Sequence, residues 1–307
     1  MSIDARPIGR LVSDQSSSYL FIVNPKAGTN REDPVDAIAD SLNSSVTYEV
    51  RVTTRVGHAT DLAEKGVQDG YDVIVAVGGD GTLNEVGRAL EGADVPMGIV
   101  PAGSGNALAR ALGVPLDWRA ACGVLLNGQE RRIDTGHLGD QIFLSTAGTA
   151  LDAEICWRFN NHKGQRGIVS YITHSISGIL SYRATQVSLQ LDDDSDAVVV
   201  RPTLLTFANT PAFGYDVTIA PGAEPDDGLL DVCVVENMTL LRAATNVHRL
   251  FSGGFDETPG VSRYRAKRIR VERERPGYIQ VDGEAKEGDA TLEASVREGG
   301  LSVIAPA

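Results

Sequence analysis

The chain has 307 residues, with 28 Lys and Arg against 41 Asp and Glu, and a formal net charge of −13. Because a domain averages roughly 100–200 residues, this length predicts one large or two ordinary domains. A hydrophobic content of 42% fits a globular protein and excludes a disordered one. The acidity argues against a general nucleic-acid binder, which needs a basic face, and against strong global attraction to anionic lipid.

Cysteine and histidine usage indicates neither a zinc site nor a disulfide framework. Cys122, Cys156 and Cys233 lie far apart and form no C-x-x-C motif, and the five histidines form no metal-type pair. A reducing cytoplasm fits this usage best. The N-terminus lacks the apolar core of a signal peptide, and no stretch approaches the roughly 18 apolar residues that span a bilayer. We therefore expect a cytoplasmic protein whose contact with membranes is peripheral.

The first part of the chain alternates between apolar strands and helices. After a polar tail at 1–18, the expected elements are a strand at Tyr19–Asn24, a helix at Asp33–Leu42, a strand at Tyr48–Thr53, a helix at Ala59–Asp69, a strand at Val73–Val77, a helix at Thr82–Leu90 and a strand at Met97–Val100. Strands separated by helices of about ten residues indicate right-handed βαβ crossovers and a parallel sheet. Apolar runs without alternation fit strands covered on both faces. We therefore expect an α/β domain with a Rossmann-like sheet over 19–130.

From residue 131 the pattern changes to many short strands divided by turn residues. The expected strands are Arg131–Gly136, Gln141–Gly148, Ala184–Leu191, Ala197–Ala208, Leu229–Val235, Arg263–Arg273, Tyr278–Val281, Ala290–Arg297 and Leu301–Ile304, with a turn at Gly299-Gly300. Only two helices interrupt them, at Ile168–Leu180 and Leu240–Phe251. Strands at this spacing favour a β-rich sandwich domain, which we place at 131–297. The active site is expected in the cleft between the two unlike domains.

Glycine-rich loops follow three strands of the α/β domain, at Asn24–Gly28, Gly78–Glu85 and Pro101–Asn106. In an open α/β sheet, ligands bind outside the carboxyl ends of the strands, which is where these loops lie. Glycines let backbone N–H groups approach an anion, and helix dipoles favour negative charge there. Together the loops predict a polyphosphate-binding site.

The common nucleotide and hydrolase motifs are absent. The sequence has no Gly-Lys dipeptide, so it has no Walker A loop, and no G-x-G-x-x-G opens a helix. A nucleophile elbow needs glycine two residues before Ser104, where Ala102 stands instead. A hydrolase and an ordinary dinucleotide-binding domain are both disfavoured.

The order and spacing of the loop motifs resemble the diacylglycerol kinase catalytic-domain family, which includes sphingosine, ceramide and bacterial lipid kinases. The resemblance rests on the run GGDGTLNE at Gly78–Glu85, the Asn24-Pro25-x-x-Gly28 motif and the run PAGSGNALAR at Pro101–Arg110. It covers nearly the whole chain and extends to Asp134, Asp227–Val232 and Val281–Glu284. It implies an α/β nucleotide domain and a β-rich lipid domain, with 298–307 returning to the first domain.

The resemblance implies ATP-dependent transfer of phosphate to a lipid hydroxyl, in lipid metabolism such as phospholipid biosynthesis. The nucleotide-binding residues that it implies are Asn24, Lys26, Gly28, Thr53, Gly78, Gly79, Asp80, Gly81, Thr82, Asn84, Glu85, Ser104 and Asn106. Phosphoryl transfer needs positioning, charge neutralisation by Mg²⁺ and a base near the acceptor hydroxyl. Asp80 and Asp134 are the candidate Mg²⁺ carboxylates. The general base is Asp80, Asp282 or Glu284, and we favour Glu284.

A second cation site is implied at the loop Glu224–Leu229. Bacterial relatives hold a structural cation with a side chain placed like Asp227 and with carbonyl oxygens at the Glu224 and Leu229 positions. Hard cations accept such oxygen ligands. An acidic turn without metal is the alternative interpretation of this loop.

One departure bears on the substrate. Many bacterial diacylglycerol kinases carry Asp directly after the Asn of the third loop, where Ala107 stands here, and the run Gly103–Ala109 looks like the sphingosine-kinase version. The acceptor therefore stays open between diacylglycerol and sphingoid lipids. The alternatives are a NAD kinase, which shares the GGDGT loop, and a regulator that binds nucleotide or lipid without turnover.

Partners follow from the same analysis. We expect a lipid with a free hydroxyl, peripheral membrane contact during turnover and no nucleic acid, and both a monomer and a homodimer stay open. The segments 168–180 and 240–251 offer amphipathic faces for lipid, although packing in the core explains most of their apolar residues equally well. A basic stretch includes Arg242, Arg249 and several arginines between 263 and 270. It offers contacts for anionic headgroups, although a solvated strand face accounts for it more simply.

Overall fold

The computed structural model describes residues 17–27, 38, 42, 46–161, 178, 181–193, 196–214 and 217–307. It divides into unit 1, Met1–Ile133 with Gly300–Ala307, and unit 2, Asp134–Gly299. Most of the expected tail at 1–18, of the helix at 33–42 and of the helix at 168–180 lies outside the described residues, as does Gly28. The functional domains predicted at 19–130 with 298–307 and at 131–297, and the cleft between them, stay a prediction.

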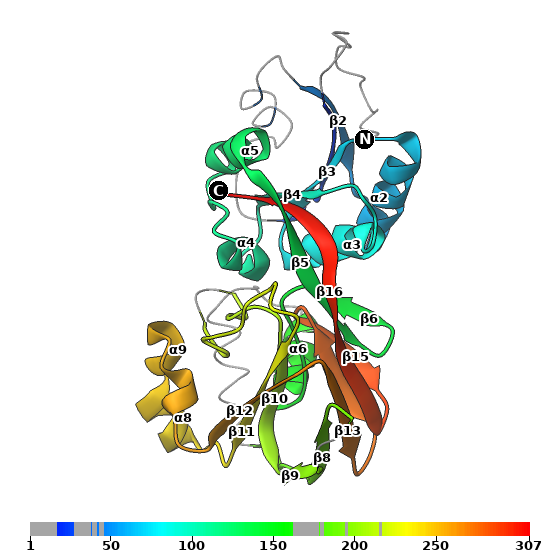
Figure 1. Cartoon of the computed structure of the whole chain (residues 1–307). Coiled ribbons are helices and arrows are strands. Elements are labelled where there is room, and N and C mark those ends of the chain that lie inside the picture. Colours follow the sequence, from blue (N-terminus) through cyan, green and yellow to red (C-terminus); the bar gives the residue numbers. More distant parts are fainter. Residues whose placement is uncertain are drawn as a thin grey trace. The chain divides into compact units, whose positions relative to one another are not determined.

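Unit 1 contains the parallel sheet that the apolar runs predict. Its strands follow the order β2-β1-β3-β4, with the end of β16 pairing in parallel with β4. The strands are β1 (Ser18–Val23), β2 (Thr47–Val52), β3 (Val73–Gly78), β4 (Met97–Pro101) and β16 (Thr291–Ala305). Every residue of β3 and β4 is buried, because these strands lie inside the sheet and carry almost only apolar residues. The predicted α/β fold class is confirmed (Figure 1).

Four helices of unit 1 are described, and the sequence analysis found only two of them. The helices are α2 (His58–Asp69), α3 (Asp80–Leu90), α4 (Ala107–Ala111) and α5 (Trp118–Asn127). The third loop leads directly into α4, whose five residues are too few for helical periodicity to show. Helix α5 begins with a cap, since the Asp117 side chain accepts a hydrogen bond from the Ala120 N–H at 3.0 Å.

Unit 2 is a sandwich of antiparallel sheets. One six-stranded sheet has the order β12-β11-β10-β7-β14-β15, and strands β13, β8 and β9 form the facing layer with the first part of β16. The strands are β5 (Gln129–Leu138), β6 (Gln141–Phe143), β7 (Thr146–Ala150), β8 (Val187–Leu191), β9 (Val198–Val200), β10 (Pro202–Ala208), β11 (Leu230–Glu236), β12 (Val261–Ala266), β13 (Arg268–Arg273), β14 (Gly277–Val281) and β15 (Glu284–Gly288). The described helices are α6 (Leu151–Asn161), α8 (Leu240–Asn246), α9 (Arg249–Ser252) and the short η1 (Phe255–Glu257).

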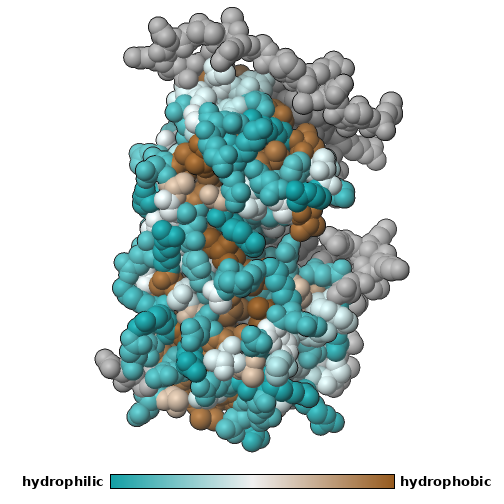
Figure 2. Space-filling model, turned by 90° about the vertical axis from the view of Figure 1, so that its right-hand side faces the viewer, coloured by the Kyte–Doolittle hydropathy of each residue, from teal (hydrophilic) through white to brown (hydrophobic). Residues whose placement is uncertain are grey.

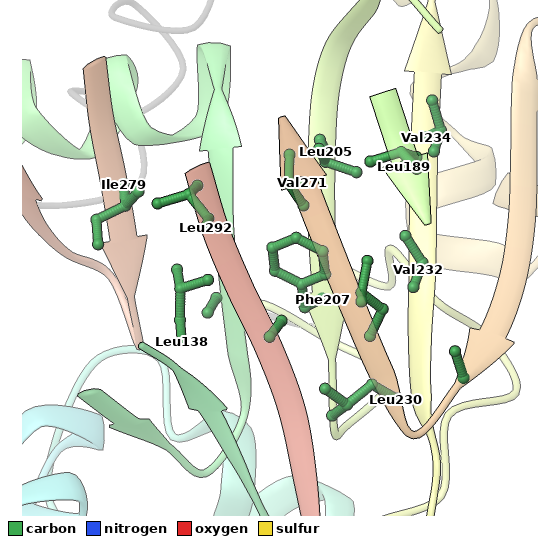
Figure 3. Close-up of a cluster of buried hydrophobic side chains, with 14 of the residues drawn as sticks. Leu138, Leu189, Leu205, Phe207, Leu230, Val232, Val234, Val271, Ile279 and Leu292 are labelled. Carbon is green, nitrogen blue, oxygen red and sulfur yellow. The ribbon is translucent and has the colours of Figure 1, made fainter. Parts of the chain in front are cut away.

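Apolar side chains from both sheets form the core of unit 2. Leu189 and Val271 come from one sheet, and Leu205, Phe207 and Val232 come from the other. Figure 3 shows these side chains pointing into the space between the strands, with Phe207 among them. The face in Figure 2 is mostly hydrophilic, with scattered apolar residues, as expected where the strongly apolar side chains lie inside.

Several expected strands are each two strands in the structure. The run Gln141–Gly148 divides into β6 and β7, Ala197–Ala208 into β9 and β10, and Arg263–Arg273 into β12 and β13. In each case the chain leaves one sheet and enters the other. At two of these corners the residue between the strands is an exposed charged one, Arg201 or Lys267, and the sequence analysis placed it inside a single strand.

The expected turn at Gly299-Gly300 is wrong, since both residues lie inside β16. Gly299 has a φ of 56°, which glycine adopts without strain. Before this point β16 pairs with β13, and after it Val303 pairs with Met97 of β4. The positive φ therefore marks a local distortion within one strand, which has β13 as its neighbour before this point and β4 after it.

Among the described helices, none is long and apolar enough to cross a bilayer.

The core assignment predicts a large difference between two substitutions in unit 2. Phe207→Ala removes a fully buried ring and should lower the free energy of unfolding by about 3–5 kcal/mol. Val199→Ala, at a side chain that is 60% exposed on β9, should change it by less than about 0.5 kcal/mol. Urea unfolding of both variants measures the difference, and equal midpoints would contradict the location of the core.

Candidate functional site

The carboxyl ends of four parallel strands lie side by side in unit 1. Val23 of β1 pairs with Val52 of β2 and with Val77 of β3, and Val77 pairs with Val100 of β4. The residues that follow these positions start the three glycine-rich loops and the segment that contains Thr53. The strand register therefore brings the predicted nucleotide-binding loops to one edge of the sheet, where ligands of open α/β sheets bind.

The second and third loops touch through their backbones. The Ala102 N–H donates to the Gly78 carbonyl oxygen at 2.8 Å. A Cβ on Gly103 would overlap the Cα of Gly79, and a Cβ on Gly79 would lie 3.0 Å from the Cα of Gly103. Gly79 and Gly103 are therefore required for the close approach of the loops, whatever ligand binds beside them.

The Asp80 carboxylate holds the third loop at its C-terminal end. Oδ2 accepts from the Asn106 N–H at 2.8 Å and Oδ1 from the Ala107 N–H at 2.6 Å. Asn106 is left-handed, with a φ of 54°, and its side-chain amide bonds the Gly103 N–H and carbonyl at 3.0 and 2.8 Å. Burial raises the pKa of Asp80, and the backbone N–H bonds partly offset this shift.

Other predicted nucleotide residues also tie loops together. The Glu85 carboxylate accepts from the Gly57 and Ala59 N–H groups at 2.8 and 3.0 Å, at the start of α2. The Asn24 side chain donates to Thr82 Oγ1 at 3.1 Å and accepts from the Lys26 N–H at 3.0 Å. These side chains position the loops and so contribute to any ligand site through the backbone.

The remaining predicted nucleotide residues differ in exposure. Lys26 and Ser104 are exposed, Thr53 is half-buried, and Asn84 is buried with its oxygen 3.5 Å from an Arg88 nitrogen. Gly81 lies in the first turn of α3, where backbone N–H groups have no acceptor within the helix. A cationic side chain, a hydroxyl and helix N–H groups are suitable contacts for a phosphate chain.

Asp134, a predicted Mg²⁺ ligand, is a buried acceptor of backbone bonds in unit 2. Its side chain is 3% exposed, and the two oxygens accept from the Gly228 and Gly299 N–H groups at 2.6 and 2.8 Å. Its own N–H donates to the Pro225 carbonyl at 2.6 Å. Asp134 therefore joins β5, the loop at 224–229 and β16.

In the loop Glu224–Leu229, predicted to hold a structural cation, the Asp227 carboxylate pairs with an arginine of the chain. Asp227 forms an ion pair with Arg265 and accepts from the Leu229 N–H at 3.0 Å. The neighbouring Asp231 is buried and pairs with Arg263. Among the described residues, no group of three or more His, Cys, Asp and Glu side chains could hold a metal ion. A guanidinium thus already neutralises the side chain that a cation at Glu224, Asp227 and Leu229 would need.

The three candidate bases differ in what surrounds their carboxylates. Asp282 and Gly283 form the tight turn between β14 and β15, with φ values of 45° and 82°. The Asp282 oxygens accept from the N–H groups of residues 144, 145 and 146 at 2.8, 2.9 and 3.0 Å. Glu284, next in the chain, is exposed, and its side chain has no hydrogen-bond partner among the described residues.

Two features of unit 2 escaped the sequence analysis. The pairing of Arg265 with Asp227 joins residues 38 apart, and no local pattern indicates it. Asp152, in the first turn of α6, is 2% exposed. An acidic residue near a helix start is ordinarily a solvated one, so a single sequence gives no sign that this carboxyl is buried.

Comparison with known proteins agrees with this geometry. A family model described as "Diacylglycerol kinase catalytic domain" matches residues 18–138, and one described as "YegS C-terminal NAD kinase beta sandwich-like domain" matches residues 145–305. A "Probable lipid kinase YegS-like" protein of Pseudomonas fluorescens is 32% identical over 293 residues, 94% of this chain and 95% of that protein. The chain belongs to the diacylglycerol kinase family of lipid kinases.

A second relative supports the same family, and a solved structure supports the fold. A "Diacylglycerol kinase" of Mycobacterium tuberculosis is 31% identical over 220 residues, 70% of this chain and 71% of that protein. A crystal structure of a diacylglycerol kinase from Bacillus anthracis has a TM-score of 0.69 at 19% identity, covering 95% of this chain and 98% of that one. The crystal structure shows the likeness of the fold alone. The family resemblance found in the sequence is confirmed, and it makes this chain a kinase of the lipid kinase type.

Two glycine substitutions should change stability in opposite directions. Gly103→Ala places a methyl group against the Gly79 backbone, and the loops must separate, at a cost of about 1–3 kcal/mol. Gly123→Ala, inside α5 with no atom within 4 Å of the new Cβ, should stabilise by about 0.5–1 kcal/mol. Thermal unfolding compares the two variants with the wild type. A stabilised Gly103→Ala variant would contradict the close approach of the loops.

Proposed function

We propose that this lipid kinase transfers the γ-phosphate of ATP to a free hydroxyl of a diacylglycerol or sphingoid lipid. The observation that carries the proposal is the convergence of the predicted nucleotide loops at one edge of the parallel sheet, locked together by Asp80. Such a fixed arrangement of backbone N–H groups suits phosphoryl transfer, where positioning and charge stabilisation supply most of the catalysis.

The nucleotide contacts follow from exposure. We assign contact with the phosphate chain to Lys26, to Ser104 and to the first turn of α3, which begins at Asp80. The net charge of −13 does not oppose ATP binding, because loop N–H groups and a helix terminus supply positive potential locally.

Mg²⁺ would neutralise charge on the phosphates. A carboxylate has about four lone-pair sites, and Asp80 uses two of them on backbone N–H groups, so this half-buried side chain still fits a cation or its water. Asp134 fits less well as a ligand, because its carboxylate, which accepts two backbone bonds as Asp80 does, is almost fully buried.

Glu284 is the proposed general base for the acceptor hydroxyl. Asp80 accepts two and Asp282 accepts three backbone N–H bonds that hold loops in place, so protonation of either carboxylate would weaken those bonds. Glu284 has no such bond among the described residues, and it follows directly on the tight turn at Asp282-Gly283. The carboxylate is therefore available for proton transfer without distortion of the fold.

The proposal predicts a specific loss of kinase activity. Labelled ATP with Mg²⁺ is supplied to diacylglycerol, sphingosine or ceramide in mixed micelles, and transfer to lipid is measured. Glu284→Gln should lower kcat by about 10²–10⁴-fold, because a positioned base contributes that much, and EDTA should abolish transfer. Glu287→Gln, at an exposed carboxylate on the same strand, is the matched control and should stay active.

Three outcomes would contradict parts of this assignment. Full activity of Glu284→Gln would remove Glu284 as the base. Phosphorylation of NAD without phosphorylation of any lipid would favour a NAD kinase. Nucleotide binding without transfer to any acceptor would favour a regulator that lacks turnover.

Membrane contact is proposed at the helices α8 and α9, which Figure 1 shows beside β12 of unit 2. No residue of α8 is buried, and Leu241, Val247 and Phe251 are 75, 49 and 56% exposed. No acidic residue occurs between 237 and 254, whereas Arg242 is exposed there and is in no ion pair with another described residue. Apolar side chains beside a cation on short helices suit the surface of an anionic bilayer.

Vesicle binding tests this α8–α9 surface. Each large apolar side chain that enters the bilayer contributes about 1.5–3 kcal/mol, so the double variant Leu241→Glu/Phe251→Glu should lose more than about tenfold in affinity for anionic vesicles. The control is Val199→Glu, at an exposed valine on β9. Unchanged binding by the double variant would overturn the surface, and so would a changed oligomeric state, which would indicate a second copy there.

A further inference from the structure

A buried carboxyl at the start of α6, that of Asp152, is not among the predicted site residues. Ala150, with a φ of 73°, ends β7 and leads into α6, whose second residue is Asp152. Asp152 Oδ2 accepts from Thr206 Oγ1 at 3.3 Å and lies 3.5 Å from Gln280 Nε2. The other oxygen, Oδ1, is buried with no hydrogen-bond partner among the described residues. An unsatisfied buried carboxyl oxygen is costly, so its retention calls for a reason.

The side chain of Gln280 links this carboxyl to the tight turn between β14 and β15. Gln280 is 1% exposed, and its Oε1 accepts from the Gly283 N–H at 3.0 Å. A second residue of α6, Asn160, donates to the Gly283 carbonyl at 3.1 Å. Both backbone groups of Gly283 are thus held by side chains, one of which depends on Asp152.

The orientation of the Gln280 amide is set by charge. Its oxygen accepts from the Gly283 N–H, which directs its nitrogen, a donor, toward Asp152 Oδ2, so an acceptor at Asp152 favours this orientation. An ionised carboxylate is the stronger acceptor, since hydrogen bonds to charged groups are about twice as strong as neutral ones. Asp152 therefore fixes the amide best in its ionised form.

We propose that Asp152 is a positioning residue, which through Gln280 holds the turn directly before Glu284 in one conformation. Its kinetic part rests on the proposed function, in which Glu284 is the general base. The structural part does not, because it concerns only the hydrogen bond at Gly283. Asp152 touches neither nucleotide nor acceptor in this proposal.

Burial raises the pKa of Asp152 to about 7, so the link changes with pH near neutrality. The nearby thiols and phenol stay neutral there, because burial raises the pKa of Cys156 and raises those of Cys233 and Tyr182 to about 12. The other titratable and charged groups on α6 and on the strands packed against it are Glu154, Arg158, Tyr278, Glu284, Lys286 and Glu287.

The sign of the effect on stability is opposite to the sign of the effect on the turn. The folded-state pKa exceeds the ordinary value of 3.8, so the protonated form favours folding, and stability is lost as pH rises through about 7. The ionised form of Asp152 destabilises the fold, but it is the form that holds the Gln280 side chain. Above about pH 7 the free energy of unfolding is therefore lower, and the turn at Asp282-Gly283 is held in one conformation.

Hydrogen exchange at the Gly283 amide, measured between about pH 5.5 and 8.5, tests the link. The protection factor of the wild type should rise roughly three- to tenfold as the pH passes 7. Asp152→Asn should abolish this step, and Gln280→Leu should leave the amide unprotected throughout. Thr206→Val removes the other hydrogen bond to Oδ2, so the step should persist, moved to higher pH.

Two further measurements separate the parts of the proposal. The melting temperature of the wild type should fall between about pH 5 and 8 relative to that of Asp152→Asn, which has no such titration. In the kinase assay, kcat of the wild type should fall as the pH drops below about 7, because Asp152 becomes protonated. Asp152→Asn should lower kcat, leave KM for ATP unchanged and remove this fall in kcat near pH 7. If the wild type phosphorylates lipid but the protection factor of its Gly283 amide does not change with pH, the link from Asp152 to the turn is overturned. A clear exchange step in a protein that phosphorylates no lipid would instead overturn the proposed function.

Discussion

The bonds from Asp80 to the backbone N–H groups of Asn106 and Ala107 are the interaction on which the nucleotide half of the molecule depends. They join the start of α3 to the start of α4, two helices that follow neighbouring strands. Parallel strands by themselves fix only where each loop begins. The shape of each loop beyond its strand has to be set by side chains, and here a single carboxylate spans the gap. Glycine at 79 and 103 brings the two backbones close enough for it to do so.

The same device recurs through the chain. Glu85 binds two N–H groups at the start of α2, Asp134 binds two between the 224–229 loop and β16, and Asp282 binds three after β6. Each of these residues belongs to a motif that resembles a catalytic or ligand-binding element. In this structure the motif carboxylates fix the conformation of the loops by accepting backbone hydrogen bonds. The groups that the loops then offer to a ligand are mostly their remaining backbone N–H groups. Alanine substitutions at such positions would therefore confuse lost chemistry with lost loop geometry, whereas Glu284 offers a cleaner test.

The sequence predicted the parts of the fold that depend on local pattern. The apolar run Val73–Val77 becomes a fully buried strand because nothing but a covered position in a sheet suits it. The corners of the sandwich at Lys267 and Arg201 were not predicted, although two exposed residues in succession, Lys267 and Arg268, interrupt the alternation after Ala266. The convergence of the loops followed from the direction of parallel strands. What each carboxylate binds did not, because the partners of Asp134 lie 94 and 165 residues away along the chain.

The excess of negative charge takes a more specific meaning from these contacts. A carboxylate that accepts two or three backbone hydrogen bonds is neutralised in part by the dipoles of the peptide groups that it orders. Asp80, Glu85, Asp134 and Asp282 thus contribute to the net charge of −13 while their oxygens face the protein backbone. Asp152 is the exception, because one of its oxygens binds nothing among the described residues and its pKa is raised to about 7. Asp152 lies outside the motifs, and its titration near neutrality therefore acts, through Gln280, beside the turn that precedes Glu284.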